Sequence, residues 1–294
     1  MTVYTSLIGG LGNQMFQYAA GRALALRKNT ELNLDVSGFE SYGLHQGFEL
    51  QRVFFACTAE IASTSDINRL LGWQSGTFIR RFMKRPAFAA FRPDAFVVEP
   101  YFHYWPGIDK VPQDCCLVGY WQSERYFADA VPQIRADFAF RLPLENQNAE
   151  LAKHIDQVNA VSLHVRRGDF VNNPKTSAKH GLCSLDYYRA AIQHVAERVQ
   201  QPHFFIFSDD MAWVQENLKI DFPCIYVQHN CGAESYNDMH LMSLCRHHII
   251  ANSSFSWWGA WLNLNMEKIV VAPQKWFAKE ADVQDLFSTG WVTL

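Results

Sequence analysis

The chain has 294 residues, a net charge of −3, and 49% hydrophobic residues against 19% charged residues. This composition excludes intrinsic disorder, gives no reason to expect a nucleic-acid partner, and supplies enough apolar side chains for one large domain or two ordinary ones. No apolar run approaches the ~18 residues that span a membrane, and the N-terminal residues lack the pattern of a signal peptide, so we expect a cytoplasmic protein.

The first segment predicts the opening of a nucleotide-binding α/β unit. A strand, a tight glycine loop, a helix and a second strand are predicted at residues 3–8, 9–13, 14–27 and 31–36. This order of elements is typical of Rossmann-like folds. The following residues, 39–140, are aromatic and contain scattered prolines, and residues 69–92 within them predict a basic helical segment.

From residue 158 onward, the pattern becomes regular. Strands are predicted at residues 160–165, 203–207, 224–227, 248–251 and 268–272. Helices are predicted between them, at residues 184–199 (with Ser184 as N-cap), 212–218, 236–244 and 257–264. Strands that alternate with helices indicate a parallel sheet covered on both faces. We therefore expect an α/β fold of two Rossmann-like domains, residues 1–145 and 146–294, facing a central cleft.

Polar residues of the second half follow the predicted strands, at the edge where open parallel sheets bind ligands. The strand at residues 160–165 contains His164 and is followed by Arg166, Arg167 and Asp169, and the strand at 203–207 is followed by Asp209 and Asp210. The strand at 224–227 is followed by Gln228 and His229, and the strand at 248–251 by Asn252, Ser253 and Ser254. Two arginines can hold a phosphate or carboxylate, and backbone N–H groups at a helix start favour an anion. An aspartate after a strand can accept hydrogen bonds from a base such as guanine. The alternative is a set of ordinary loop residues with a local Arg–Asp ion pair.

The glycine loop leaves a nicotinamide-dependent oxidoreductase as an alternative. Gly10 and Gly12 match the first two glycines of G-x-G-x-x-G, and Asp35 lies where a ribose-binding acid would, but Met15 occupies the third position. Asn13 and Gln14 place two amide side chains where that fingerprint leaves the backbone accessible to the dinucleotide. There is no D-x-D motif and no cysteine or histidine spacing typical of zinc, so we expect no metal cofactor.

Four segments together resemble the motifs of the α-1,2-fucosyltransferases, glycosyltransferase family 11. They are residues 9–18 (GGLGNQMFQY in full), 119–124, 164–169 and 252–259. The H-x-R-R-x-D pattern of residues 164–169 is shared with α-1,6- and protein O-fucosyltransferases. Because the motifs extend from residue 9 to residue 259, the resemblance covers nearly the whole chain. Animal members carry an N-terminal membrane anchor that this sequence lacks, so it is most similar to a bacterial enzyme.

The resemblance implies a GT-B type fold and a metal-independent, inverting transfer of L-fucose from GDP-β-L-fucose. The implied acceptor is the 2-hydroxyl of a terminal galactose or similar sugar, in a surface glycan or a lipid-linked oligosaccharide. Arg166 would contact the β-phosphate, His164 would lie against the donor, and Asp210 would recognise the guanine. The implied catalytic residues are Arg166 and Asn13, and the implied donor-binding residues are Gly10, Gly12, Gln14, His164, Asp169, Asp210, Asn252, Ser253, Ser254 and Phe255.

Several points stay open at the level of sequence. Candidates for the general base are Asp35, Glu40, His45 and Glu49. The basic residues of 69–92, interleaved with apolar ones, predict either a helix packed into the first domain or peripheral contact with an anionic membrane. A protein O-fucosyltransferase-like enzyme remains an alternative. So does a glycan-binding protein with a sugar platform made of Trp257, Trp258 and Trp261.

Overall fold

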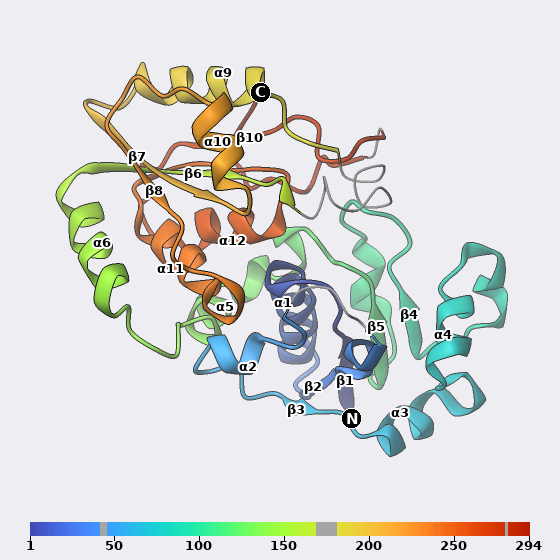
Figure 1. The fold of residues 1–294 in the computed structure, drawn as a ribbon. Coiled ribbons are helices and arrows are strands. Elements are labelled where there is room, and N and C mark those ends of the chain that lie inside the picture. The colour runs from blue at the N-terminus through green and yellow to red at the C-terminus, as the bar shows by residue number, and fades with distance from the viewer. Residues whose placement is uncertain (42–45, 169–180, 280–281) are drawn as a thin grey trace. The chain divides into compact units, whose positions relative to one another are not determined.

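The computed structural model describes residues 1–41, 46–168, 181–279 and 282–294. The chain forms two compact units, Met1–Arg141 with Gln284–Leu286, and Leu142–Val283 with Phe287–Leu294. The change of unit falls just before the expected boundary at residue 145, and a short C-terminal stretch packs with the first unit. Each unit is an α/β structure built on a parallel sheet (Figure 1).

The first unit contains a five-stranded sheet of order β3-β2-β1-β5-β4, in which all neighbours are parallel. Its strands are β1 (Thr2–Ser6), β2 (Glu31–Asp35), β3 (Glu60–Ile61), β4 (Phe96–Val98) and β5 (Cys115–Val118). Its α-helices are α1 (Leu11–Arg27), α2 (Leu50–Val53), α3 (Thr64–Leu71), α4 (Thr77–Met83) and α5 (Val131–Asp137). Short 3₁₀ helices are η1 (Ser37–Ser41), η2 (Gly72–Gln74), η3 (Pro86–Phe91), η4 (Pro106–Lys110), η5 (Glu124–Tyr126) and η6 (Ala128–Ala130).

Helix α1 lies tightly against the strands that precede and follow it. Most of its residues are buried, and alanines dominate its middle. A Cβ added at Gly21 would lie 2.9 Å from Leu32 Cδ1 of β2, so the small residue permits the close packing of helix on sheet. The strand–loop–helix–strand prediction for residues 3–36 is therefore confirmed, although α1 begins at Leu11 rather than at residue 14.

The prediction of one basic helical segment at residues 69–92 is wrong. Helix α3 ends where Gly72 takes a left-handed φ of 57°, and Pro86 ends the turn that follows α4. The result is a series of short helices, α3, η2, α4 and η3. Their apolar side packs on one face of the sheet through residues such as Ile67, Leu71 and Met83, which join Tyr4, Phe96 and Cys116 in one cluster.

The second unit contains a six-stranded sheet of order β11-β10-β9-β6-β7-β8, again with parallel neighbours. Its strands are β6 (Asn159–Val165), β7 (Pro202–Ser208), β8 (Cys224–Val227), β9 (His247–Ile249), β10 (Val270–Ala272) and β11 (Val292–Thr293). Its helices are α6 (Asn146–Gln157), α9 (Leu185–Ala196), α10 (Met211–Asn217), α11 (Tyr236–Leu244) and α12 (Ser254–Leu262), with the 3₁₀ helix η7 (Gly232–Glu234).

The core of the second unit lies on both faces of this sheet. Alternate residues of β7 point to opposite sides: Phe204 and Ile206 pack with residues of α9 and α10, while Phe205 and Phe207 pack with residues of α6 and α11. In Figure 1, α9 and α10 accordingly cover one face, and α6 and α11 cover the other. The doubly covered parallel sheet predicted for the second half is confirmed.

Both sheets have a topological switch point. This is the place where two neighbouring strands have connections that run to opposite sides of the sheet. In the first unit it lies between the neighbours β1 and β5, and in the second between the neighbours β6 and β9. Loops that follow these strands line the crevice in which open α/β sheets bind ligands. No helix in the described ranges is long and apolar enough to cross a membrane.

Candidate functional site

The switch point of the second unit places a pair of arginines beside two aspartates. Arg166 and Arg167 follow β6, and the Nε of Arg166 lies 3.1 Å from Asp209 Oδ2. The Nε of Arg167 lies 3.4 Å from Asp210 Oδ2, and its guanidinium stacks 3.6 Å from the ring centroid of Trp213. The Arg–Asp ion pairs that the sequence left as an alternative are thus present.

These pairs leave the two arginines in different situations. The guanidinium of Arg167 is held at its Nε by the carboxylate of Asp210 and on one face by the indole of Trp213. For Arg166, the structure provides an ion pair with Asp209 at a side chain that is 21% exposed. Asp210 caps α10 by accepting from the N–H of Trp213 at 3.3 Å. Its predicted role in guanine recognition remains a prediction.

The loop after β9 leads into α12, whose start carries the predicted anion-binding residues. Helix α12 begins at Ser254, three residues earlier than predicted, because Ser253 is its N-cap and accepts from the N–H of Phe255 at 3.3 Å. The N-terminus of α12 therefore lies at the switch-point edge. Its first N–H groups and the positive end of the helix dipole both favour an anion there. Asn252 is buried, and its Nδ2 donates to the carbonyls of Gly181 and Trp276, so it supports the loop.

The two loops meet beside β6. His164 is the penultimate residue of that strand, is buried, and lies with its ring 6.0 Å from the ring of Phe255. The structure therefore brings Arg166, His164, Ser253 and Phe255 to one edge of the second unit, as the sequence predicts. Asp169 lies outside the described residues.

The tryptophans considered as a sugar platform belong to the core. Trp257 and Trp258 are fully buried, and Trp261 is 4% exposed. The three rings contact one another with centroid distances between 5.0 and 6.3 Å. These three rings therefore offer no exposed surface to a sugar, and the glycan-platform interpretation of them is wrong.

In the first unit, the glycine loop is held by amide side chains. Gly9 has a φ of 89°, and an added Cβ would lie 2.6 Å from Asn13 Nδ2, so only glycine fits there. Gln14 is buried: its Nε2 donates to the carbonyls of Gly9 and Gly47, and its Oε1 accepts from the N–H of Glu49. The structure thus gives Gln14 a role inside the loop. Gly10 is the N-cap of α1, and Gly12 lies in its first turn.

Hydrogen bonds also join the two sides of this switch point. The Nε2 of Gln122, in the turn after β5, donates to Asn13 Oδ1 at 2.7 Å. The Nε2 of Gln17 donates to the carbonyl of Gly119 at 3.0 Å, while its Oε1 accepts from the N–H of Ile8. Sequence reasoning identified the motif at residues 119–124 but assigned it no role, because partners about a hundred positions apart leave no signal in a single sequence.

A partly buried carboxylate missed by the sequence analysis supports the same turn. Glu99 directly follows β4, and its two oxygens accept from the backbone N–H groups of Tyr120 at 2.7 Å and Trp121 at 2.9 Å. Burial raises the pKa of Glu99 to about 7, although the two hydrogen bonds oppose the shift. The available signal was a lone glutamate at the end of a short apolar run, Phe96–Val98.

The proposed base candidates mostly have structural partners. Asp35 is buried and forms an ion pair with Arg80, and it also accepts from the Ser37 hydroxyl at 2.6 Å. Glu49 is buried and pairs with Arg52 at 2.8 Å, and burial raises its pKa against the effect of that arginine. Glu40 is exposed, and His45 lies outside the described residues. Asp35 is therefore a structural residue and no ribose-binding acid.

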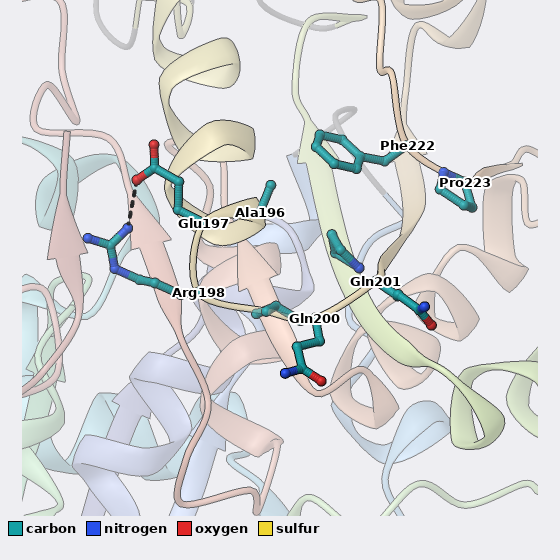
Figure 2. Close-up of a pocket in the computed structure, with 9 residues that line it drawn as sticks. Ala196, Glu197, Arg198, Gln200, Gln201, Phe222 and Pro223 are labelled. Carbon is teal, nitrogen blue, oxygen red and sulfur yellow. Dashed lines mark hydrogen bonds and ion pairs between the residues drawn. The ribbon is translucent and has the colours of Figure 1, made fainter.

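A pocket of about 700 Å³ lies in the second unit, away from the switch point of that unit. Residues 196–202, at the end of α9 and the start of β7, line it together with Phe222 and Pro223, which precede β8 (Figure 2). It therefore lies at the amino ends of the strands, opposite the edge where α/β sheets bind ligands. Among the described residues, no group of three or more His, Cys, Asp or Glu side chains is placed to hold a metal ion.

Comparisons with known proteins give a family, two similar relatives and a shared fold. The model of the family "Glycosyl transferase family 11" matches residues 78–294. An α-1,2-colitosyltransferase of Escherichia coli is 37% identical over 95% of this chain and 93% of its own length. The O-antigen biosynthesis glycosyltransferase WbnK of Escherichia coli is 34% identical over 99% of this chain and 100% of its own length. The crystal structure of the fucosyltransferase NodZ from Bradyrhizobium shares the fold, with a TM-score of 0.51 at 14% identity, covering 89% of this chain and 93% of that one.

Proposed function

Because this chain belongs to glycosyltransferase family 11, we propose that it transfers L-fucose from GDP-β-L-fucose to the 2-hydroxyl of a galactoside in an O-antigen or similar surface glycan. The observation that carries the proposal is the juxtaposition of Arg166 with the start of α12 at the switch point of the second unit. An arginine that follows one strand and a helix N-terminus that follows the neighbouring strand can together bind a diphosphate.

In this proposal, the second unit binds the donor and stabilises the leaving group. As the bond between sugar and phosphate breaks, negative charge grows on the β-phosphate of GDP. Arg166 and the N–H groups at the start of α12 neutralise that charge, as oxyanion donors do in other enzymes. His164 and Asp210, from the same edge, contact the nucleoside. The acceptor hydroxyl attacks from the opposite face of the fucose ring and gives an α-linked product with inversion.

The first unit is proposed to serve the acceptor side of a GT-B type cleft. Its switch point presents Asn13, held by Gln122, beside the glycine loop. An amide there can hydrogen-bond a sugar hydroxyl while the reaction proceeds. Glu49, which accepts from the N–H of Leu11 at the start of α1, remains a candidate for the base.

A second donor is favoured by one specific observation, the similarity to an α-1,2-colitosyltransferase. Colitose is fucose without its 3-hydroxyl, so a site built for either sugar differs mainly in the partner of that hydroxyl. Purified protein supplied with GDP-fucose or GDP-colitose and a lactose acceptor decides between them. We expect faster transfer of fucose; faster transfer of colitose would support the second donor, and no transfer of either sugar would refute the proposed function.

Sugar transfer is expected to survive removal of divalent cations. Arginine and backbone N–H groups take the place of a metal at the diphosphate, so excess EDTA should leave the rate unchanged within twofold. The measurement is the initial rate of GDP release with and without EDTA. Loss of activity that Mg²⁺ or Mn²⁺ restores would contradict the proposed leaving-group stabilisation.

We also propose that α4 and η3 touch an anionic membrane that carries the acceptor. The outer side of α4 places the rings of Phe78 and Phe82 4.8 Å apart, with the guanidinium of Arg85 4.9 Å from the ring of Phe82. Phe78 and Phe91 are 72% and 67% exposed. A mixed aromatic and basic surface of this kind suits the interface of an anionic bilayer. Arg80 does not contribute, because it is buried against Asp35.

Removing the exposed charges should weaken vesicle binding without affecting catalysis. Each basic residue near an anionic surface is worth about 1 kcal/mol, so the triple variant of Arg81, Lys84 and Arg85 to Gln should bind phosphatidylglycerol vesicles at least ~10-fold more weakly. The matched control replaces three exposed basic residues of the second unit, Lys153, Arg189 and Arg198, by Gln. Equal binding by both triple variants, or no binding by the unaltered protein at low salt, would contradict the membrane proposal.

A further inference from the structure

We propose that Glu99 is a positioning residue of the transfer reaction, which holds the turn after β5 in the conformation that brings Gln122 onto Asn13. This inference rests on the proposed function, since it concerns the rate of sugar transfer. It assigns a role to the motif at residues 119–124 and to a carboxylate that belongs to none of the recognised motifs.

Glu99 contacts the turn after β5 through both oxygens of its carboxylate. Its Oε2 accepts from the N–H of Tyr120 and its Oε1 from the N–H of Trp121, so both carboxylate oxygens bind backbone. The side chain runs directly against Gly119, where an added Cβ would lie 2.4 Å from Glu99 Cβ. The glycine therefore leaves the room that the carboxylate needs to reach two successive N–H groups.

The turn itself contains a residue in an uncommon backbone conformation. Trp121 is fully buried and has a φ of 55°, in the left-handed region that residues with a Cβ rarely adopt. The N–H groups of the two successive residues Tyr120 and Trp121 donate to the Glu99 carboxylate, and these bonds favour this conformation over a relaxed one. At the start of the turn, Gln17 holds the carbonyl of Gly119 at 3.0 Å.

The turn places the side chain of Gln122 in contact with Asn13. Gln122 directly follows Trp121, and its Nε2 reaches Asn13 Oδ1 at 2.7 Å across the switch point between β1 and β5. Because Gln122 holds the Oδ1 of Asn13, it also fixes the direction in which the Nδ2 of the same amide points. A substitution at Glu99 would let the turn relax and would displace Gln122. Asn13 would then lose the hydrogen bond that orients its amide, so Glu99 acts through Gln122 and Asn13.

The protonation state of Glu99 gives the proposal a measurable signature. Its pKa is raised to about 7 by burial, so the carboxylate loses its charge just below neutral pH. The ionisable groups on which its charge acts are the phenols of Tyr120 and Tyr126, whose pKa values are also raised by burial, so they stay neutral in this range. His103 lies in the loop that follows β4, and its ring stacks on the ring of Tyr101.

Protonation removes the charge from both hydrogen bonds and weakens the hold on the turn. We therefore expect the turnover number to rise with pH up to about 7 and then level off. Glu99→Gln, with one acceptor oxygen instead of two, should lower the turnover number about 10-fold, because small displacements of positioning groups are costly. The same variant should lose the rise of the turnover number with pH below pH 7 (the limb below pH 7), and its KM for the GDP-sugar should change less than twofold. The matched control is Glu60→Gln, which removes an exposed glutamate from β3 of the same sheet.

A double-mutant cycle with Gln122→Ala separates positioning from a merely structural role. If Glu99 acts through Gln122, adding Glu99→Gln to Gln122→Ala changes the turnover number less than twofold, and Gln122→Ala alone already lacks the limb below pH 7. Independent, multiplicative losses, or an unchanged limb in Gln122→Ala, would overturn the inference. The pH profile of Gln122→Ala gives this answer even if Glu99→Gln fails to fold, which its thermal unfolding would show. Absence of transfer by the unaltered protein would instead refute the proposed function.

Discussion

Arg166→Ala is expected to lower the turnover of sugar transfer at least ~100-fold, the scale of losing one donor to a developing anion. Arg166 lies at the end of β6 beside the start of α12, where the β-phosphate of the leaving GDP is proposed to lie. Its loss would also leave Asp209 without the 3.1 Å partner that now balances its charge. Initial rates at saturating donor, together with the dissociation constant for GDP from calorimetry, provide the measurement.

Arg167 supplies the comparison within the same loop. Its guanidinium is already held by Asp210 and by the ring of Trp213. Arg167→Ala should therefore weaken packing around α10 and reduce thermal stability more than it reduces the affinity for GDP. An equal loss of GDP affinity in both single variants would show that the two arginines bind the diphosphate as a pair, contrary to the separate roles assigned here.

Asn13→Ala is expected to reduce the turnover number about 100-fold while leaving the affinity for GDP unchanged within twofold. The physical reason is that Asn13 belongs to the first unit, whereas the proposed nucleotide contacts belong to the second. The effect corresponds to one well-placed hydrogen-bond donor at the reacting centre. Single-turnover rates and calorimetry with GDP measure the two quantities separately.

Asn13→Asp sharpens that test. It keeps an oxygen that can accept from Gln122 Nε2, but it removes the Nδ2 donor. Loss of turnover equal to that of the alanine variant would assign the effect to the donor, whereas near-normal turnover would show that the contact with Gln122 is what matters. Asn68→Ala, an exposed position on α3, is the control for a change of the same residue type in the same unit.

The regular elements of the second half could be predicted because their periodicity is local. Strand β8 and helix α11 lie at the predicted residues, and Ser184 caps α9 by accepting from the N–H of Tyr187 at 3.1 Å. Helix α12 begins earlier than predicted because the apolar pattern starts at Trp257, whereas the capping geometry starts at Ser253. A side-chain cap, more than hydrophobic spacing, decides where such a helix begins.

The first unit was harder to predict because its important contacts join distant residues. Arg80 lies in a run of basic residues that suggests a solvated surface, yet its partner Asp35 is 45 positions away. The same holds for Gln122 with Asn13 and for Glu99 with Tyr120 and Trp121. Single-sequence patterns show which side chains could form hydrogen bonds, but the sheet order β3-β2-β1-β5-β4 determines which of them meet.

The linkage and configuration of the transferred sugar test the central claim most directly. Purified protein incubated with GDP-β-L-fucose and lactose should yield a product in which NMR shows an α-L-fucosyl residue on O2 of galactose. That result requires attack from the face opposite the leaving GDP and recognition of the 2-hydroxyl. A β-linked fucose, a linkage to another hydroxyl, or release of free fucose without transfer would contradict the proposed inverting α-1,2 transfer.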